Sequence, residues 1–208
     1  MLTLYYSPGA CSLASHIALE ETGAPFEARP VILAKGEQRT PEYMAINPRA
    51  RVPALRVDGG EVLTENPAIL THLARRFPEA GLLPADPLAE ARCLSLMAFL
   101  SSTVHPAFAH IFRPERFADD TAAHPAIKET GRRVFFDCLK EIDGLLAGKE
   151  WVQGSYTVCD PYLLVFYWWG MRIELPVAEL ANYTAHKQRM LARPAVRRAI
   201  EREGIPLA

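Results

Sequence analysis

The sequence predicts a small α/β domain followed by an all-α domain. Residues 1–77 alternate between short β-prone segments and helical segments, which is the pattern of a mixed sheet layered with helices. Residues 78–87 are rich in proline, glycine and alanine, as domain boundaries often are. From residue 88 onward, apolar residues recur at helical spacing. We therefore place the α/β domain at residues 1–80, a linker at 81–86 and an α-helical bundle domain at 87–208.

The composition excludes several classes of protein. Half of the 208 residues are hydrophobic and the net charge is -1, without a basic or acidic block, so we expect neither nucleic acid nor an anionic membrane as a partner. The four cysteines are far apart and share no metal-ligand spacing, so we expect no metal site and no disulfide framework. No signal peptide is recognisable, and the most apolar run, residues 162–171, is about half the length that spans a bilayer. We expect a cytoplasmic protein.

The first strand, turn and helix carry the most informative residue, Cys11. Residues 2–5 are apolar and β-prone, Ser7-Pro8-Gly9 is typical of a turn, and residues 13–22 form a helical pattern. Cys11 thus lies at the start of a helix, where unpaired N–H groups and the helix dipole favour thiolate. Such cysteines can have pKa values of about 3.5–7.5, against about 8.5 for a free thiol.

Cys11 has no thiol partner in its own helix. Ala14 stands where a thioredoxin-type redox motif has its second cysteine. Disulfide chemistry at Cys11 would therefore need a thiol from elsewhere, most simply a small-molecule thiol. The alternative is an inert cysteine that packs at the start of the helix, and this segment alone does not decide between the two.

The remainder of the α/β domain continues the alternation. Gly23 and Pro25 end the first helix. Asn66 is a good N-cap and Pro67 suits the first position of a helix that reaches Phe77. The other expected elements are strands at residues 27–33, 52–57 and 61–64, a loop at 34–40, one or two helical turns at 41–46, and a hairpin turn at 58–60.

Helix-start signals divide the second domain into its helices. Asp86 and Pro87 suit the N-cap and first position of a helix over residues 88–112, which we expect Pro106 to kink. Thr157 to Asp160 resembles a capping box, with Asp in place of the usual Glu or Gln. The further expected helices are at residues 127–146, 162–172, 178–192 and from 194 onward.

Five segments, taken in order, resemble motifs of the cytosolic glutathione transferases, most closely the bacterial beta class. They are residues 6–16 (Tyr-Ser-Pro-Gly-Ala-Cys-Ser-Leu-Ala-Ser-His), 47–53, 65–70, the pair 104–105 with 112–114, and 157–160. The resemblance covers essentially the whole chain. It implies a thioredoxin-like first domain, a homodimer, glutathione as co-substrate and a small hydrophobic electrophile bound between the domains.

The resemblance implies four candidate catalytic residues. Cys11 would contact the glutathione sulfur, directly or as a mixed disulfide. Tyr6 and Ser12 carry the nearest hydroxyls, although Tyr6 has the alternative of a core aromatic at the end of a strand. His105 would face the cleft between the domains and bond the sulfur or the glycyl end of glutathione; a core histidine is the alternative.

The resemblance also implies how glutathione would be bound. A cis peptide bond between Val52 and Pro53 would present the backbone of Val52 to the cysteinyl part of glutathione. Glu65 would pair with the α-ammonium, and the helix start at Asn66 would suit the γ-glutamyl carboxylate; plain helix capping is the alternative for this pair. Ala10 and Lys35 complete the candidates, with Lys35 as a partner for the glycyl carboxylate or a solvated surface lysine.

Several residues bear on the electrophile and on affinity. Phe112 and Arg113 are the candidates for electrophile binding, and other nearby aromatics could contribute or simply fill the core: Phe108, Tyr167 and Trp168. Ala98 and Pro106 stand where related sequences can carry Asn and Lys, so two hydrogen bonds to glutathione are in question. We expect packing roles for His16, Cys93, Cys138 and Cys159.

The expected function is therefore that of a glutathione transferase. It would conjugate glutathione to hydrophobic electrophiles, catalyse glutathione-dependent thiol–disulfide exchange through Cys11, or do both, because cysteine attacks disulfides and hydroxyls do not. Two alternatives remain from the sequence: a non-catalytic ligand-binding protein, and a glutathione-dependent isomerase or dehalogenase.

Overall fold

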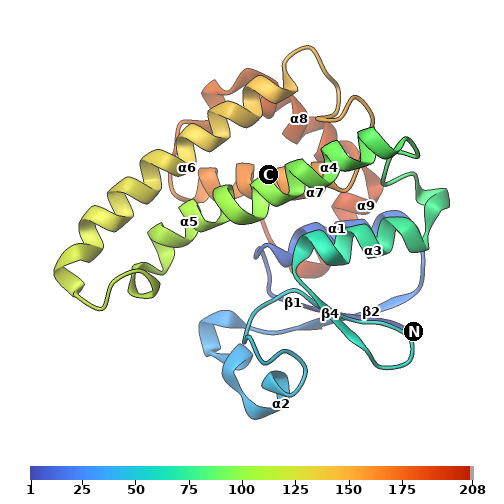
Figure 1. Cartoon of the computed structure of the whole chain (residues 1–208), viewed down its shortest axis with the longest axis horizontal. Coiled ribbons are helices and arrows are strands. Elements are labelled where there is room, and N and C mark those ends of the chain that lie inside the picture. Colours follow the sequence, from blue (N-terminus) through green and yellow to red (C-terminus); the bar gives the residue numbers. More distant parts are fainter. Residues whose placement is uncertain (207–208) are drawn as a thin grey trace.

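A four-stranded mixed sheet organises the first part of the chain in the computed structural model, which describes residues 1–206 (Figure 1). The strand order is β2-β1-β3-β4, with β1 parallel to β2, β3 antiparallel to β1, and β4 antiparallel to β3. The strands are β1 (Leu2–Tyr6), β2 (Phe26–Pro30), β3 (Ala54–Arg56) and β4 (Val62–Thr64). The predicted α/β layer with a mixed sheet is confirmed.

The side-chain alternation of β1 separates the two faces of this sheet. Leu4 and Tyr6 point into the main core, beneath helices α1 (Ser12–Thr22) and α3 (Asn66–Arg76). Tyr5 points the other way and packs with Tyr43 of the short helix α2 (Pro41–Met44). Figure 1 shows α1 and α3 between the sheet and the remaining helices, and α2 on the far side of the sheet. This arrangement places the start of α1 against the second half of the molecule.

Three of the predicted strands are shorter than expected, and one of them, predicted at residues 61–64, loses only its first residue. The strand predicted at residues 27–33 ends at Pro30, and two 3-10 turns, Leu33–Lys35 and Glu37–Arg39, occupy the expected loop. The strand predicted at 52–57 begins only at Ala54. At the second place Pro53 supplies no N–H to the ladder, so the regular pairing of β3 begins only after it.

The second half of the chain is helical, as predicted. Its helices are α4 (Pro87–Phe99), α5 (His105–Phe112), α6 (His124–Leu146), α7 (Cys159–Arg172), α8 (Ala181–Ala192) and α9 (Pro194–Glu203). Helix α7 lies at the centre of this half, because every residue from Cys159 to Gly170 is buried. Its apolar sequence is therefore that of a core helix.

The long helix predicted at residues 88–112 contains a π-helical turn rather than a simple proline kink. The turn spans Leu100–Val104, between α4 and α5. Pro106 falls in the first turn of α5, where a missing N–H is tolerated, and the backbone of Val104 and His105 stays helical (φ -65° and -63°). The widened turn thus takes up the interruption that the proline makes in the hydrogen-bond ladder.

Of the three predicted helix caps, one is confirmed, one is wrong and one is formed only in part. Asp86 accepts a hydrogen bond from the Ala89 N–H at 2.8 Å, as expected. Asn66 is not the cap of α3, since Glu65 occupies that position and Asn66 is the first helical residue. Asp160 accepts from the Thr157 N–H at 2.8 Å, whereas the Thr157 hydroxyl accepts from Cys159 rather than from Asp160.

The two halves share one continuous hydrophobic core. It contains side chains of β1, α1 and α3 together with those of α4 to α9. Helix α9 is also joined to α1 by ion pairs: Arg198 and Arg202 of α9 contact Glu20 of α1 at 2.7 Å and 2.9 Å. The assignment of residues 81–86 as an inter-domain linker stays a prediction.

One helical stretch, Pro87–Phe112, is long and apolar enough to cross a membrane by length and hydropathy alone. Core helices of soluble proteins pass the same test. Only 28% of its most apolar window is buried within the monomer, so α4 carries apolar residues that the rest of the described chain leaves uncovered.

Candidate active site

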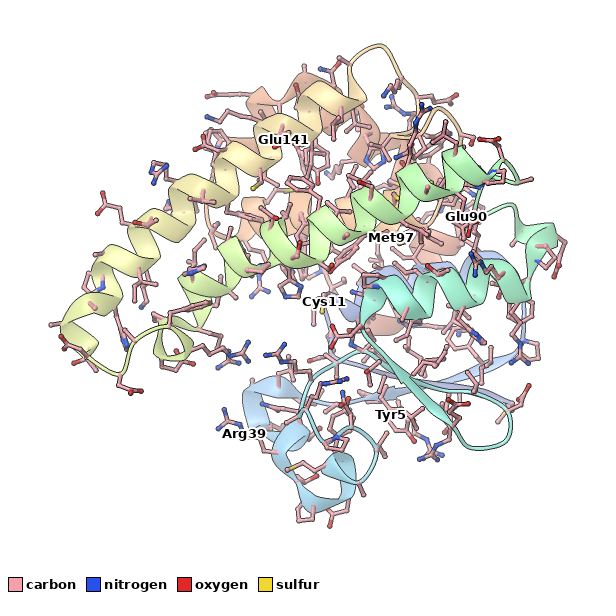
Figure 2. The ribbon with its side chains drawn as sticks, in the orientation of Figure 1. Tyr5, Cys11, Arg39, Glu90, Met97 and Glu141 are labelled. Carbon is pink, nitrogen blue, oxygen red and sulfur yellow. The ribbon has the colours of Figure 1, made fainter. Side chains whose placement is uncertain are left out.

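Cys11 occupies the cap position immediately before α1, as the sequence predicted. Its side chain is buried, and the Sγ–H group donates a hydrogen bond to the carbonyl oxygen of Val52 at 3.4 Å. The Val52–Pro53 peptide bond is cis, which confirms that expectation. Figure 2 shows Cys11 where the start of α1 meets the helical half of the molecule.

The prediction that the helix start lowers the pKa of Cys11 is wrong in direction. Burial raises the pKa of this thiol to about 12, and the nearby carboxylate of Glu65 raises it further. The backbone N–H groups of Cys11 and Ser12 and the charge of Arg51 lower the pKa, but by less. The helix start does act on the sulfur, but loss of water outweighs it, so Cys11 is a hydrogen-bonded thiol at neutral pH.

The turn that leads to Cys11 is held on both sides at Gly9. The Gly9 N–H donates to Glu203 of α9 at 2.8 Å, and the indole N–H of Trp169 of α7 donates to the Gly9 carbonyl at 3.0 Å. Gly9 has a φ of +66°, and a Cβ there would lie 2.0 Å from the ring of Trp168. Both the backbone conformation and the close packing therefore require glycine.

The two hydroxyls nearest to Cys11 in the sequence, those of Ser12 and Tyr6, have different surroundings. Ser12 is fully buried, and its hydroxyl accepts from the Ser7 N–H at 3.1 Å and donates to the Ser7 carbonyl at 3.2 Å. Tyr6 packs in the main core with its ring 5.1 Å from that of His16. Burial raises the pKa of Tyr6, and Glu203 adds to that rise. Ser12 closes the turn, and Tyr6 stands as a core aromatic.

Glu65 combines an exposed side chain with an unusual backbone. It has a φ of +69° at the start of α3, a conformation that costs an L-residue energy and that recurs at functional sites. Within residues 1–206, its carboxylate has no cation within 4.0 Å. A strained, exposed and unpaired carboxylate at a helix start is suited to a cationic ligand group.

Asn66 connects α3 to the cysteine rather than capping its own helix. Its side-chain amide donates to the carbonyl oxygen of Cys11 at 2.8 Å and accepts from the Ser15 hydroxyl at 2.7 Å. Asn66 is buried and both ends of its amide are bonded. It therefore positions the backbone of Cys11, and the helix N–H groups of α3 remain the part suited to an anion.

His105 lies where α5 begins, against aromatic rings of α7. Its ring lies 5.1 Å from that of Trp169 and 6.2 Å from that of Phe166. Burial, together with the charges of Arg51 and Arg116, lowers the pKa of His105 to about 4. The imidazole is therefore neutral near pH 7 and can offer one N–H donor and one acceptor nitrogen.

Tyr162 is a residue of this region that the sequence interpretation missed. Its hydroxyl lies 3.5 Å from Nδ1 of His105. Burial raises the pKa of Tyr162, and the proximity of Cys11 adds to the rise. The two residues are 57 positions apart, so no local spacing could have paired them, and Tyr162 is one of several aromatic residues in an apolar helix.

The remaining candidates for glutathione binding are Ala10 and Lys35. Ala10 belongs to the turn before Cys11, where its N–H donates to Ser7 at 3.0 Å and its carbonyl accepts from Leu13 at 3.0 Å. Lys35 is exposed at the end of a 3-10 turn. The structure leaves Lys35 free to meet either a ligand or solvent.

The electrophile candidates separate into a stacked aromatic surface and a set of core residues. Phe112, which is 49% exposed, stacks on Phe108 at 4.7 Å, and Phe108 stacks on Trp169 at 4.2 Å. Arg113 is half-buried at the end of α5. Tyr167 instead lies in the core of the helical half, where its hydroxyl bonds Thr184 at 2.9 Å. Trp168 backs the Gly9 turn and donates its indole N–H to Pro206.

The residues expected to have packing roles are buried. His16 is fully buried and bonds Glu203 at 2.9 Å. Cys93, Cys138 and Cys159 are free and buried. Across residues 1–206, no three His, Cys, Asp or Glu side chains are grouped as a metal site would require.

Comparison with known proteins finds relatives along the whole chain. The "Glutathione S-transferase, N-terminal domain" family matches residues 9–76. Glutathione S-transferase GstA of Escherichia coli O157:H7 is 34% identical over 98% of this chain and 100% of its own. A Sulfitobacter glutathione transferase homologue with bound glutathione superposes with a TM-score of 0.94, at 36% identity over 99% of both chains. The bacterial beta class enzyme of Sphingomonas chungbukensis gives 0.87 at 38% identity, over 98% of this chain and 100% of that one.

The alternative of a glutathione-dependent isomerase is supported over only part of the chain. Maleylacetoacetate isomerase of Pseudomonas aeruginosa is 42% identical, but over only 103 residues, 49% of each chain. The full-length relatives are transferases, and they confirm the thioredoxin-like domain, the helical domain and glutathione as the co-substrate. The chain therefore belongs to the glutathione S-transferase family, among its bacterial beta-class members, and is a glutathione transferase.

Proposed function

We propose that glutathione binds along the start of α1 and α3, with its sulfur beside Cys11. The observation that carries this proposal is that two contacts meet at Cys11. The Sγ–H group of Cys11 donates to the Val52 carbonyl, and the Asn66 amide donates to the carbonyl of Cys11. The γ-glutamyl carboxylate would meet the first N–H groups of α3, and its ammonium would pair with Glu65. Lys35 and Ala10 would complete the site on its glycyl side.

Glutathione bound in this way would change the charge around Cys11. Its ammonium would neutralise Glu65, which is the second cause of the raised pKa of Cys11 after burial. The hydrogen bond from Cys11 to Val52 would open as the peptide pairs with the Val52 backbone. Both changes make the sulfur of Cys11 more available.

Two reactions follow from this arrangement. In exchange, the Cys11 thiolate attacks a disulfide sulfur, forming Cys11–S–S–glutathione and releasing the other half as a thiolate; a second glutathione then restores the Cys11 thiolate and leaves as glutathione disulfide. In conjugation, the glutathione thiolate attacks an electrophilic carbon, the leaving group departs with its electron pair, and the thiol proton passes to solvent. We propose that the protein does both.

His105 would serve conjugation as a hydrogen-bond donor rather than as a base. A neutral imidazole that accepts the Tyr162 hydroxyl at Nδ1 carries its proton on Nε2. That N–H would stabilise the charge on the sulfur or on the leaving group. Tyr162 is then a positioning residue that fixes the tautomer of His105.

The variant Cys11→Ala tests the division between the reactions. We expect it to abolish disulfide exchange, because no other thiol reaches the site, while conjugation of a neutral nitroaryl chloride retains at least about a tenth of its rate, since the hydrogen-bond donors remain. Steady-state rates of both reactions, with Cys138→Ala as the matched control, provide the comparison. Equal loss of both reactions would contradict separable roles.

The electrophile would pack on the aromatic surface of α5. Phe112 is exposed above Phe108 and Trp169, and such stacked rings suit a flat apolar body. A small hydrophobic electrophile would therefore lie between Phe112 and the Cys11 turn, in contact with both halves of the chain.

We also propose that the protein is a cytoplasmic homodimer that joins through α4. Leu88 and Leu94 are exposed on this helix (60% and 37%), and most of its apolar window is uncovered in the monomer. Exposed apolar patches of this kind mark association surfaces. Ala98 lies exposed on the same helix, so its contribution to glutathione affinity would depend on the partner subunit.

A further inference from the structure

Four arginines lie near Cys11 and His105, and the established activity does not explain them. Arg51 directly precedes Val52, the residue whose carbonyl accepts from Cys11. Its own carbonyl is fixed by the Tyr43 hydroxyl at 2.6 Å and the Asn47 amide at 2.7 Å, while its side chain is exposed. The backbone of Arg51 is thus fixed next to the residue that accepts the sulfur's hydrogen bond.

The other three arginines come from both halves of the chain. Arg113 and Arg116 follow α5, the helix that begins with His105, and Arg116 ends a 3-10 turn. Arg39 ends the 3-10 turn just before α2, and Figure 2 shows it at the edge of the first half of the molecule. Arg39 and Arg116 are exposed and Arg113 is half-buried.

These guanidinium groups act on one another and on His105. After burial, the charges of Arg51, Arg113 and Arg39 lower the pKa of Arg116, and only Glu115 opposes them. Arg51 and Arg116 likewise lower the pKa of His105. Charges that perturb the same groups lie close together. The four residues, two from each half of the chain, therefore form one group, which we call the arginine cluster.

The arginine cluster lacks counter-ions of its own. Within residues 1–206, Arg39, Arg51 and Arg116 have no carboxylate within 4.0 Å, and Arg113 has only Glu115, at 3.9 Å. The net charge of the whole chain is -1, so the excess of positive charge is local. Unpaired arginines at the opening of a cleft attract and orient anions.

Glutathione accounts for only part of this charge. In the proposed site its γ-glutamyl carboxylate lies at α3, which leaves one glycyl carboxylate for Lys35 or for one arginine. At least two guanidinium groups then remain without a partner, since Arg113 already has Glu115 at 3.9 Å. They adjoin the exposed ring of Phe112, which directly precedes Arg113, so apolar and cationic surface lie side by side.

We propose that the arginine cluster selects an electrophile that carries a carboxylate or another anionic group on an apolar body. The anion would bind between Arg116 and Arg113 from the helical half and Arg51 from the first half, with the apolar body on Phe112. This inference rests on the proposed glutathione site and adds the charge of the second substrate. The guanidinium fork suits a carboxylate in two parallel hydrogen bonds.

The test compares two electrophiles that differ only in charge. They are 4-chloro-3-nitrobenzoate and the neutral 4-chloro-3-nitrobenzamide, both of which form a C–S bond to glutathione at C4 and release chloride. Each kcat/KM is divided by the uncatalysed rate with glutathione, which removes the difference in intrinsic reactivity. We expect the normalised value to be about tenfold higher for the benzoate and to fall towards that of the benzamide in 0.5 M salt.

Variants locate the effect. Arg113→Gln/Arg116→Gln should remove the preference, which means that the ratio of the two normalised kcat/KM values, benzoate to benzamide, should fall to about one. Arg133→Gln/Arg197→Gln, which removes two exposed arginines of α6 and α9, should keep the preference.

The outcomes separate this proposal from the glutathione site itself. Equal normalised values for the two electrophiles, or a preference that survives Arg113→Gln/Arg116→Gln, would overturn the anionic electrophile while the benzamide turnover still upheld the transferase. Turnover of neither electrophile, with no heat of glutathione binding by calorimetry, would overturn the proposed glutathione site, and the inference with it.

Discussion

At the scale of single residues, burial decides the chemistry of Cys11 more than its place in a helix does. The first N–H groups of α1 favour thiolate, yet the sulfur is enclosed and Glu65 lies near it. The result is a thiol that donates to Val52. The raised pKa therefore favours the protonated form of Cys11 at neutral pH.

The raised pKa of Cys11 predicts the pH dependence of its alkylation. Because burial and Glu65 raise this pKa to about 12, and only Arg51 and the local N–H groups oppose them, the thiolate fraction should grow through the whole accessible range. We expect the rate of reaction with iodoacetamide to rise about tenfold per pH unit from pH 7 to 10 without a plateau. Subtracting the rate of Cys11→Ser removes the other cysteines, and a plateau below pH 8 would show a thiolate already present.

Two substitutions of Glu65 separate the effect of its backbone strain on stability from the effect of its charge on glutathione binding. Glu65→Gly should weaken glutathione binding about tenfold or more, since a charge-assisted hydrogen bond is lost, and should raise the free energy of unfolding by about 1 kcal/mol, since glycine relieves the φ of +69°. Glu65→Gln, the matched control, should weaken binding alike without the gain in stability. Calorimetry and urea unfolding measure the two effects, and a loss of stability in the glycine variant would contradict the strain.

At the scale of elements, Asp160 ties the start of α7 to two neighbouring segments. Its carboxylate accepts from the N–H groups of Val152 (3.1 Å) and Thr157 (2.8 Å) and contacts His186 of α8 at 3.0 Å. Both members of the Asp160–His186 pair are fully buried. The capping box thus does more than begin a helix, because it fixes the core helix against α8.

Asp160→Asn should therefore destabilise the protein by about 3 kcal/mol, because a buried acceptor is replaced in part by a donor that faces other donors. Asp86→Asn makes the same chemical change at an exposed cap with one acceptor bond and should cost less than about 0.5 kcal/mol, since Asn caps as well as Asp. Urea unfolding of both variants measures the difference. Similar losses in the two would show that the network around Asp160 is not cooperative.

The elements were largely predictable from sequence, whereas the contacts between them were not. Period and turn signals located the strands, the helices and the cap at Asp86, because these depend on neighbouring residues. Asn66 was mistaken for a cap because its partners, Ser15 and Cys11, are brought to it by the fold. The pairing of Tyr162 with His105 and the burial of Cys11 are likewise tertiary, so the family motifs suggested site residues but could not indicate their protonation.

At the scale of the whole molecule, one core joins the two halves and one apolar face remains open. The shared core holds the Cys11 turn between α7 and α9, through Trp169 and Glu203. The open face includes Leu88 and Leu94 of α4. The first feature makes the active site a product of both halves, and the second predicts association of two chains.

Sedimentation equilibrium tests that association. We expect twice the monomer mass for the wild type, and Leu94→Glu should raise the dimer dissociation constant about a hundredfold, because it buries a charge in an apolar interface. Leu145→Glu is the matched control, since Leu145 of α6 is equally exposed (37%). A monomeric wild type, or equal effects of the two variants, would contradict an interface on α4.

The most direct test of the glutathione site is the intact mass of the protein after incubation with glutathione disulfide. The proposed site predicts one added glutathionyl group in the wild type and in Cys138→Ser, and none in Cys11→Ser, because Cys11 is the cysteine placed beside the glutathione sulfur. No adduct in the wild type, or an adduct that persists in Cys11→Ser, would contradict the placement of the glutathione sulfur beside Cys11.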